Sequence, residues 1–591
     1  MATFVCVGRG LRPGVQGFGR HDVRGVALTV RTDTTTASVA VVQAHRVRSR
    51  RPRSARYRLW TALACAVATL ATAGFMLNGN IRYQVGVGRV SGFSIAETFS
   101  HRPIAFRLLS AGQAWFPELV STLGGPPGSW GRVWVFETGF RLIAAGMAAA
   151  AAALLWTGLR QRWGPQAWLY AIAAYAALVF TAPATGEPDW MAALLAVAAV
   201  GAGLAWRPRI GAVAGGVLLA VVALVKISTL PVALAALVII WAFDRRRAWV
   251  AGATALVAGL LAVGLMWWLA PYEIAWLLDI RALQPDPWTP DSAVEAGHYL
   301  MNLAARWPVV ALIPAFFVGA RRDEKLTAAA ALALTCVTVV AQGQYYIYHS
   351  AGLVALSALL AVRTVQRSRA ALRWPLLGLT GWTLVLFLLP AAWRIDNLTR
   401  LYLLTGAAAV ALAVWQQVAL RRPPTARLPA HRAAGWPAIL VLVAMLATQT
   451  PYSSESLTLS TTAARTSATS SDTLRKELAD AESIHALIGV DTPVAYLVFG
   501  ASTYAIGNPT HCRFPSALFL QRPGAREKVS PATRQENLAC LSQPDAQWLV
   551  WDRDWLRRRT APDDLRTAID QHWDCDAATL IGGYTLCPRR A

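Results

Sequence analysis

The chain has 591 residues, of which 55% are hydrophobic and only 15% are charged, whereas about 25% of the residues in a soluble domain are charged. Its formal net charge of +24 would fit a nucleic-acid-binding protein, but the basic residues fall mostly in short clusters between long apolar segments. That pattern is typical of a polytopic membrane protein and argues against nucleic acid as a partner.

The N-terminal region, residues 1–57, is rich in Arg and has no apolar core, which predicts a disordered cytoplasmic tail. The apolar segment Leu59–Leu77 follows directly and has no convincing cleavage site, so we predict an uncleaved signal anchor. Further apolar segments, each bounded by charges, Pro or Gly, bring the prediction to thirteen membrane-spanning helices. These segments are Trp134–Trp156, Ala167–Pro183, Trp190–Trp206, Ile210–Val225, Thr229–Phe243, Trp249–Ala270, Trp307–Ala320, Leu326–Ala341, Ala351–Val362, Trp374–Ala392, Leu401–Leu420 and Trp436–Thr450.

The connections between the apolar segments indicate the orientation in the membrane. With a cytoplasmic N-terminus, every connection on the cytoplasmic side carries basic residues, as the positive-inside rule requires. The outer connections are acidic, neutral or sparsely basic, and two of them are long, residues 78–131 and 271–306. The odd number of spans places the C-terminus outside. We therefore expect a multi-pass protein of the cell membrane, with membrane lipid as a partner and an extracytoplasmic C-terminal domain.

The last part of the chain is polar and is predicted to form a separate domain. Residues 451–471 are a Ser/Thr-rich linker that cannot bury a core, and residues 472–591 alternate between helical and extended patterns. The expected elements are a helix over Asp472–Ile488, strands over Val494–Phe499 and Gln547–Trp551, a helix over Asp564–His572, and a hairpin over Ala578–Cys587. The predicted fold class is thus a mainly α polytopic membrane protein, spanning residues 58–450, with a small C-terminal α/β domain.

Four of the seven cysteines lie in the C-terminal domain, and this even number indicates two disulfides in an oxidising compartment. Cys575 and Cys587 flank the predicted hairpin, so we predict that they pair with each other. Cys512 and Cys540 would then form the second bridge. Four cysteines allow three connectivities, so the other pairings stay open.

The first long outer loop contains a dense group of polar residues. Glu97, His101, Arg102 and Arg107 lie within eleven positions, and from Pro103 onward the apolar spacing fits an amphipathic helix on the membrane surface. A carboxylate can accept a proton from a sugar hydroxyl, while Arg and His can bind a lipid phosphate. An interfacial helix with solvated charges explains the same spacing equally well.

Two further polar groups lie at helix ends that are predicted to face outward. Glu187 and Asp189 begin an apolar segment, where acids are costly unless they are exposed or functional, although a helix cap would account for one of them. Lys226 is a lone base on the outer side, against the orientation bias. Its ammonium group either reaches the interface by snorkelling or binds a phosphate there.

A third polar group is the segment Gln342–His349, which combines Gln342, Gln344, Tyr345 and His349 at the end of an apolar segment. One interpretation is that the tyrosines at this depth form an aromatic belt at the membrane interface and bind no ligand. The two Gln and the His beside them favour hydrogen bonding to a ligand.

Several common motifs are missing from the sequence. It contains no P-loop, dinucleotide-binding fingerprint or zinc-like Cys/His spacing, which argues against ATP hydrolysis by this chain. The interiors of the predicted helices carry almost no ionisable groups, which counts against an ion-coupled transporter. The sequence leaves open whether a divalent metal takes part.

Together these features resemble the GT-C class of membrane glycosyltransferases, and within it the protein mannosyltransferase-like and aminoarabinose-transferase-like branch. The resemblance rests on a His-x-Pro segment at His101–Pro103, the acids at Glu187–Asp189, a Lys–Ser/Thr–Pro segment at Lys226–Pro231, and the segment Gln342–His349. It covers most of the chain beyond about Arg56. Members of the class commonly carry an acid soon after the first helix; residues 78–94 contain none, and Glu97 takes its place.

The resemblance implies an inverting transferase that moves a sugar from a polyprenyl-phosphate donor to a glycan, protein or lipid acceptor on the outer face, for cell-envelope glycan or glycoprotein assembly. Glu97, favoured over Asp189 and Glu187, would deprotonate the acceptor hydroxyl. The residues implied in donor and phosphate binding are His101, Arg102, Lys226, Gln342, Gln344, Tyr345 and His349. The alternatives are a transporter or flippase of a lipid-linked precursor, which would usually show internal repeats, and a non-catalytic envelope assembly protein with the same fold.

Overall fold

The computed structural model describes most of the chain. The described residues are 51–73, 102–180, 185–205, 207–283, 289–343, 345–368, 378, 381–382, 385, 389–421, 467–498, 502–512 and 525–591. The chain divides into the units Met1–Arg56 and Tyr57–Ala591, and every contact discussed below lies within the second unit. Residues 1–50 of the predicted tail lie outside the described residues, whereas the first helix begins at Arg51, within the predicted tail.

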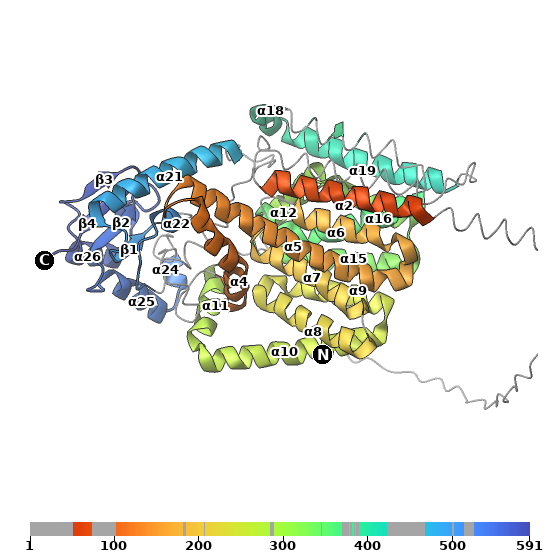
Figure 1. Cartoon of the computed structure of the whole chain (residues 1–591), viewed down its shortest axis with the longest axis horizontal. Coiled ribbons are helices and arrows are strands. Elements are labelled where there is room, and N and C mark those ends of the chain that lie inside the picture. The colour runs from red at the N-terminus through yellow and green to blue at the C-terminus, as the bar shows by residue number, and fades with distance from the viewer. Residues whose placement is uncertain are drawn as a thin grey trace, which may run out of the picture. The chain divides into compact units, whose positions relative to one another are not determined.

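The region before the C-terminal domain is helical throughout its described elements (Figure 1). The first half contains α2 (Arg51–Ala73), α4 (Ile104–Ser121), α5 (Trp130–Trp163), α6 (Ala167–Val179), α7 (Pro188–Ala205), α8 (Pro208–Val225), α9 (Leu230–Phe243) and α10 (Arg245–Leu269). The second half contains α11 (Pro271–Leu283), α12 (Pro290–Arg306), α13 (Pro308–Ala311), α14 (Ile313–Gly319), α15 (Arg322–Val340), α16 (Ala351–Ser368), α18 (Ala391–Asp396) and α19 (Leu398–Arg421).

Fewer of these helices qualify as membrane spans than the sequence predicts. Among the described residues, 6 helices are long and apolar enough to cross a membrane, or 7 if the bent pair Ala293–Arg306 and Val309–Gly319 is one span. The apolar helices α6 and α9 have only 13 and 14 residues, short of the about 20 needed for a straight crossing. The predicted span 436–450, and most of 374–392, lie outside the described residues. The protein is therefore a multi-pass membrane protein, while the count of thirteen stays a prediction.

Helix α7 lies at the centre of the bundle. It packs against α5 on one side and α8 on another, and 89% of its apolar window is buried by protein. Small residues permit this close packing: a Cβ at Gly158 of α5 would lie 2.7 Å from the carbonyl oxygen of Gly201 of α7. A Cβ at Gly201 would collide with the backbone of α5 at Leu154 and Leu155. The close contact fixes α7, whose first turn carries Asp189.

Helix α4 confirms the helix predicted from Pro103 onward in the first outer loop. It begins directly after Pro103 and buries Phe106 and Arg107 against the bundle. Trp115 and Phe116 are exposed on its other face, as expected for a helix at a membrane surface. The second long outer loop differs from the prediction, because residues 271–306 form the helices α11 and α12 with only a short interval between them.

The C-terminal domain contains the predicted α/β elements. Its elements are α21 (Ser467–Ile488), β1 (Val494–Leu497), α22 (Ser502–Ile506), α24 (Ala525–Lys528), α25 (Pro531–Leu541), β2 (Trp548–Asp552), α26 (Asp563–His572), β3 (Thr579–Ile581) and β4 (Tyr584–Pro588). The sheet order is β1-β2-β4-β3, with β1 and β2 parallel and the other pairs antiparallel. Alternate residues of β2 face opposite sides: Val550 packs in the core with α21, and Leu549 and Trp551 in the core with α26.

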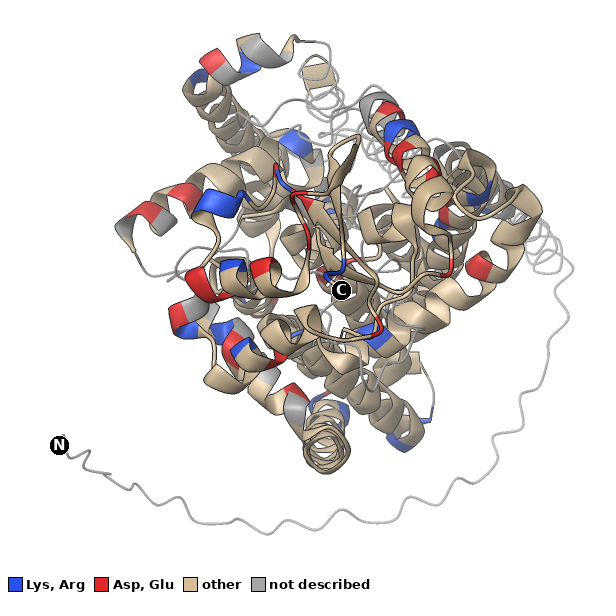
Figure 2. Cartoon of the chain, turned by 90° about the vertical axis from the view of Figure 1, so that its left-hand side faces the viewer, with Lys and Arg blue, Asp and Glu red and all other residues tan. Residues whose placement is uncertain are grey.

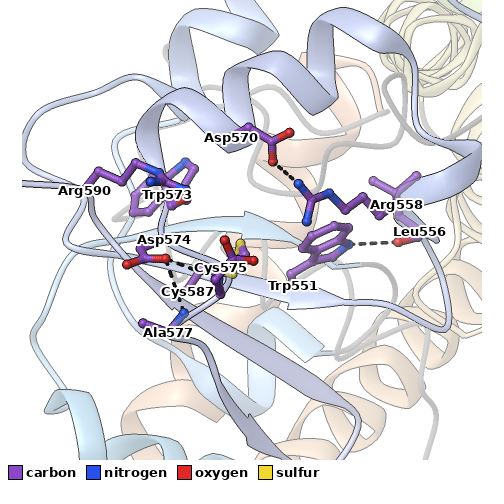
Figure 3. The surroundings of a disulfide bond; sticks show 11 residues. Trp551, Leu556, Arg558, Asp570, Trp573, Asp574, Cys575, Ala577, Cys587 and Arg590 are labelled. Atoms are coloured by element: carbon purple, nitrogen blue, oxygen red, sulfur yellow. Dashed lines mark hydrogen bonds and ion pairs between the residues drawn. A yellow bond between two sulfur atoms is a disulfide. The ribbon is translucent and has the colours of Figure 1, made fainter.

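Both predicted disulfides are present, Cys512–Cys540 and Cys575–Cys587. The second joins β4 to the segment before β3, so it closes the hairpin that turns at Gly582 with a φ of 57° (Figure 3). The Asp574 carboxylate accepts a hydrogen bond from the amide of Ala577 at 3.3 Å beside this bridge. Viewed from the end that carries the C-terminus, acidic and basic residues of the described part of the chain are interspersed (Figure 2).

The C-terminal domain shares a hydrophobic core with the outer parts of α4 and α5. Phe136 of α5 contacts Tyr504 of α22, with ring centroids 5.8 Å apart. The Arg475 guanidinium of α21 lies 4.7 Å from the ring centroid of Trp130, at the start of α5. Helix α5 has 34 residues, more than a bilayer requires, and this extra length carries the domain contact.

Candidate active site

Four of the predicted site residues come together at the ends of three helices. Asp189 lies in the first turn of α7, Lys226 directly follows α8, and Gln342 follows α15. Glu187 precedes α7 and lies beside this group. Glu97, His101 and Gln344 lie outside the described residues, so their positions stay predictions.

Asp189 is the centre of the first cluster. Its Oδ2 atom lies 3.1 Å from Nζ of Lys226, and its Oδ1 atom accepts a hydrogen bond of 3.0 Å from Nε2 of Gln342. Lys226 also donates to Oε1 of Gln342, so the three side chains form a closed triangle. Nε2 of Gln342 is oriented further by Thr338, whose carbonyl oxygen accepts from it at 2.9 Å.

The backbone explains why these three groups meet. Pro188 is the first residue of α7 and has no amide hydrogen to leave unpaired, which suits a helix start. Lys226 has extended φ and ψ angles of −163° and 137°, which end α8 and direct the chain into α9. Gly343, with a φ of 58°, stops the chain after α15 at Gln342.

A second ion pair lies beside the first cluster. Nη2 of Arg102 lies 2.8 Å from Oε2 of Glu187, and both side chains are buried. Burial raises the pKa of the Glu187 carboxyl, and the nearby Arg102 and Lys226 charges compensate only part of that effect. Arg102 immediately precedes Pro103 and α4, so the pair joins the surface helix to the start of α7.

The segment before α16 contributes aromatic rings and an imidazole. His349 is buried, its ring lies 4.4 Å from that of Tyr348 at a steep angle, and it is close enough to Asp189 for an electrostatic interaction. The hydroxyl of Tyr299 on α12 donates to the carbonyl oxygen of Tyr346 at 2.9 Å. Tyr345 lies 5.7 Å, ring to ring, from Tyr299. The polar cluster predicted around Gln342 and His349 thus contacts the second outer region through α12.

Two further buried ion pairs are not predicted from the sequence. Arg107 of α4 pairs with Glu273 of α11, and Arg141 pairs with Glu137 one turn earlier on α5, at 3.1 Å. Both acids are fully buried. For Glu137 and Arg141 the signal was available, since an acid and a base four residues apart in an apolar segment are costly unless they pair. Glu273 is the third residue of α11, two positions after Pro271, and nothing in its spacing identifies its partner.

The arrangement defines a polytopic membrane protein with buried carboxylates and bases at one end of its central helices. Such a site can hold an anionic group on Arg102 and Lys226, and can orient or deprotonate a hydroxyl with a carboxylate. Within the described part of the chain, no group of three or more His, Cys, Asp or Glu residues could hold a metal ion.

Comparison with known proteins gives one match. No protein-family model and no curated protein matches the chain. The crystal structure of ArnT from Cupriavidus metallidurans in the apo state is similar, with a TM-score of 0.46 and 13% sequence identity, over 90% of this chain and 97% of that chain.

Proposed function

We propose that the protein is a membrane glycosyltransferase that moves a sugar from a polyprenyl-phosphate donor to an acceptor at the outer face of the membrane. The observation that supports this most is the joining of Asp189, Lys226 and Gln342 into one buried cluster beside the Arg102–Glu187 pair. The donor's lipid tail requires a membrane protein, and its phosphate requires cations at the depth of the lipid headgroups. The acceptor is a glycan, a protein or a lipid.

In the proposed reaction, the acceptor hydroxyl attacks the anomeric carbon of the sugar. A carboxylate takes the hydroxyl proton while the bond from the anomeric carbon to the phosphate oxygen breaks. The phosphate leaves with the bonding electron pair, and the configuration at the anomeric carbon inverts. We assign the base to Glu97, with Asp189 as the alternative, because both oxygens of Asp189 already accept hydrogen bonds from Lys226 and Gln342.

Lys226 is suited to hold the leaving phosphate. An ammonium group has three N–H donors, and among the described residues two of them go to Asp189 and Gln342. The third N–H remains for a phosphate oxygen. Arg102 would supply a second cation from the neighbouring pair, so negative charge that develops on the phosphate would meet two fixed positive charges.

Matched variants can show which of the two candidate residues, Glu97 or Asp189, is the base. With a radiolabelled polyprenyl-phosphate sugar and purified protein in nanodiscs, we expect Glu97→Gln to keep donor binding and to lower kcat by about 10²–10⁴-fold, the usual size of general-base catalysis. Lys226→Ala should instead weaken donor binding, because one phosphate contact is lost. Asp291→Asn, an exposed acid at the start of α12, is the control and should keep wild-type turnover.

Other outcomes would change the assignment. If Asp189→Asn loses turnover with donor binding intact while Glu97→Gln keeps it, the base is Asp189. If Glu97→Gln, Asp189→Asn and Lys226→Ala all match the wild type in binding and turnover, the proposed site is wrong. A folded wild-type protein that binds the donor and transfers nothing would favour the non-catalytic assembly protein.

A further inference from the structure

Helix α11 carries two buried acids that contact different parts of the molecule. Glu273 is fully buried and Asp279 is 6% exposed. Six positions at 100° per residue place their side chains about 120° apart around the helix axis. One acid therefore faces the membrane-surface helix α4, and the other faces the C-terminal domain.

Asp279 closes the N-terminus of α25, which lies about 250 residues later in the chain. Its Oδ1 atom accepts from the amide of Ser530 at 2.9 Å, and its Oδ2 atom accepts from the hydroxyls of Ser530 at 3.0 Å and Thr533 at 2.6 Å. Ser530 is itself the N-cap of α25 and accepts from the amide of Thr533. A carboxylate at this position also opposes the positive end of the helix dipole.

Glu273 connects the same helix to the candidate site. Its carboxylate pairs with Arg107 in the first turn of α4. Five residues earlier, Arg102 pairs with Glu187, which lies beside the Asp189 cluster. Both acids of α11 are buried, so withdrawing either partner would leave a buried charge uncompensated. Separating α11 from α4 or from α25 therefore carries a large free-energy cost.

We propose that α11 is a strut that couples docking of the C-terminal domain to the position of Arg102 and Glu187, with Asp279 and Glu273 as its positioning residues. Loss of the Asp279 cap would loosen α25, then α11, and through Glu273 the first turn of α4. The coupling is reciprocal, so disturbing Glu273 should loosen α25 as well. Only the effect on turnover rests on the proposed function; the coupling itself does not.

Hydrogen–deuterium exchange of the full chain in nanodiscs tests the strut without any activity assay. We expect Asp279→Asn to speed exchange of the amides at residues 532–537 by about fivefold, as for the loss of one helix cap. Exchange at residues 104–110, the first two turns of α4, should rise in the same variant. Glu273→Gln should reproduce both changes. If Asp279→Asn does not fold, Ser530→Ala removes one partner of Asp279 and should give the same pattern at smaller size.

The control is Asp563→Asn, which alters an exposed acid at the start of α26, in the same domain but away from α11. It should change exchange only locally. The strut is ruled out if Asp279→Asn loosens α25 but leaves α4 unchanged, or if it changes neither. If transfer activity is present, Asp279→Asn should raise KM for the donor more than it lowers kcat, because Arg102 is disturbed rather than the base. Coupled exchange without any transfer would keep the strut and reject the proposed function.

Discussion

Lys226 and Asp189 form an ion pair in which the two partners are unequally covered. The Asp189 side chain is 2% exposed and that of Lys226 is 20% exposed. The Asp189 charge has therefore lost more of its water than the Lys226 charge, and its stability relies more on the ion pair. Removing one member of a buried pair is costly because the remaining charge has lost its water and its partner. Removing both members is much less costly, and this difference provides a test that needs no substrate.

We expect Lys226→Met alone to destabilise the folded protein by on the order of 3 kcal/mol, the low end for a broken buried pair. The double variant Lys226→Met/Asp189→Asn should recover a large part of that loss, since no charge remains unpaired. Thermal unfolding of the detergent-solubilised protein measures both. Additive losses in the double variant would show that the two side chains do not interact in solution.

The sequence identified the members of this cluster but not their pairing. Glu187, Asp189, Lys226 and Gln342 are each recognisable as polar groups at the end of an apolar segment. Their contacts bridge 37 to 153 positions along the chain, and no local pattern encodes which helix ends meet. Arg102 was predicted to bind phosphate, and its ion pair with Glu187 was not foreseen.

At the next scale, α15 and α16 are joined by one carboxylate at the end opposite to the candidate site. Glu324 accepts hydrogen bonds from Arg363 at 2.9 Å, from Arg367, and from the amide of Arg321 at 3.0 Å. Burial alone would raise the pKa of Glu324, but these bonds outweigh burial and lower the pKa to about 2. Glu324 precedes the apolar segment of α15, so these bonds hold the ends of α15 and α16 together at the membrane boundary. We call this contact the Glu324 clamp.

This clamp should be sensitive to acid. Because the pKa of Glu324 is lowered in the folded protein, its contribution to stability is complete above the unfolded value of 4.5 and is lost as the pH falls toward about 2. We expect the melting temperature of the wild type to fall over this range more steeply than that of Glu324→Gln, which should also melt lower at pH 7. If the melting temperatures of the two proteins fall by the same amount between pH 6 and pH 3, Glu324 does not stabilise the contact between α15 and α16.

Helices and strands were the most predictable level of this protein. Apolar runs gave the helices α5 to α10, and alternating segments gave β1, β2 and the β3–β4 hairpin within a few residues. The sequence does not predict helices α11 and α12, because residues 271–306 are too polar for a membrane span and favour a loop. The short helices α6 and α9 show why apolar runs overcount spans: composition identifies burial in a bundle, but length decides whether a helix crosses.

For the whole molecule, the contacts place the candidate site and a basic cluster at opposite ends of the bundle. Helix α9 begins near Lys226, and Asp244 directly follows its last residue. The Oδ2 atom of Asp244 lies 3.6 Å from Nη2 of Arg162 and 3.2 Å from Nε of Arg247. Helix α10 returns to the first end and leads into α11, which contacts the C-terminal domain. The site and the domain therefore lie at the same end of the bundle, and the positive-inside rule predicts that this end faces outward.

Reporter fusions test this orientation. Alkaline phosphatase joined after Thr185, Ser228 or Ser471 should be active, because the enzyme folds only outside the cytoplasm. Fusions after Arg162 or Arg247 should be inactive, and a cytoplasmic reporter at the same positions should give the reverse. Activity after Arg162 together with inactivity after Ser471 would invert the topology and place the two disulfides in a reducing compartment.

The unequal burial of the helices has a consequence for how the protein responds to its lipids. Only 6% of the residues in the apolar window of α10 are buried, against 89% of those in the window of α7. A change in bilayer thickness therefore acts directly on α10, which can tilt to relieve the mismatch, while α7 has almost no lipid neighbours. Because α7 carries Asp189, this acid is shielded from direct contact with lipid, and a change in membrane thickness would instead reach the site through α10 and the helix α11 that follows it.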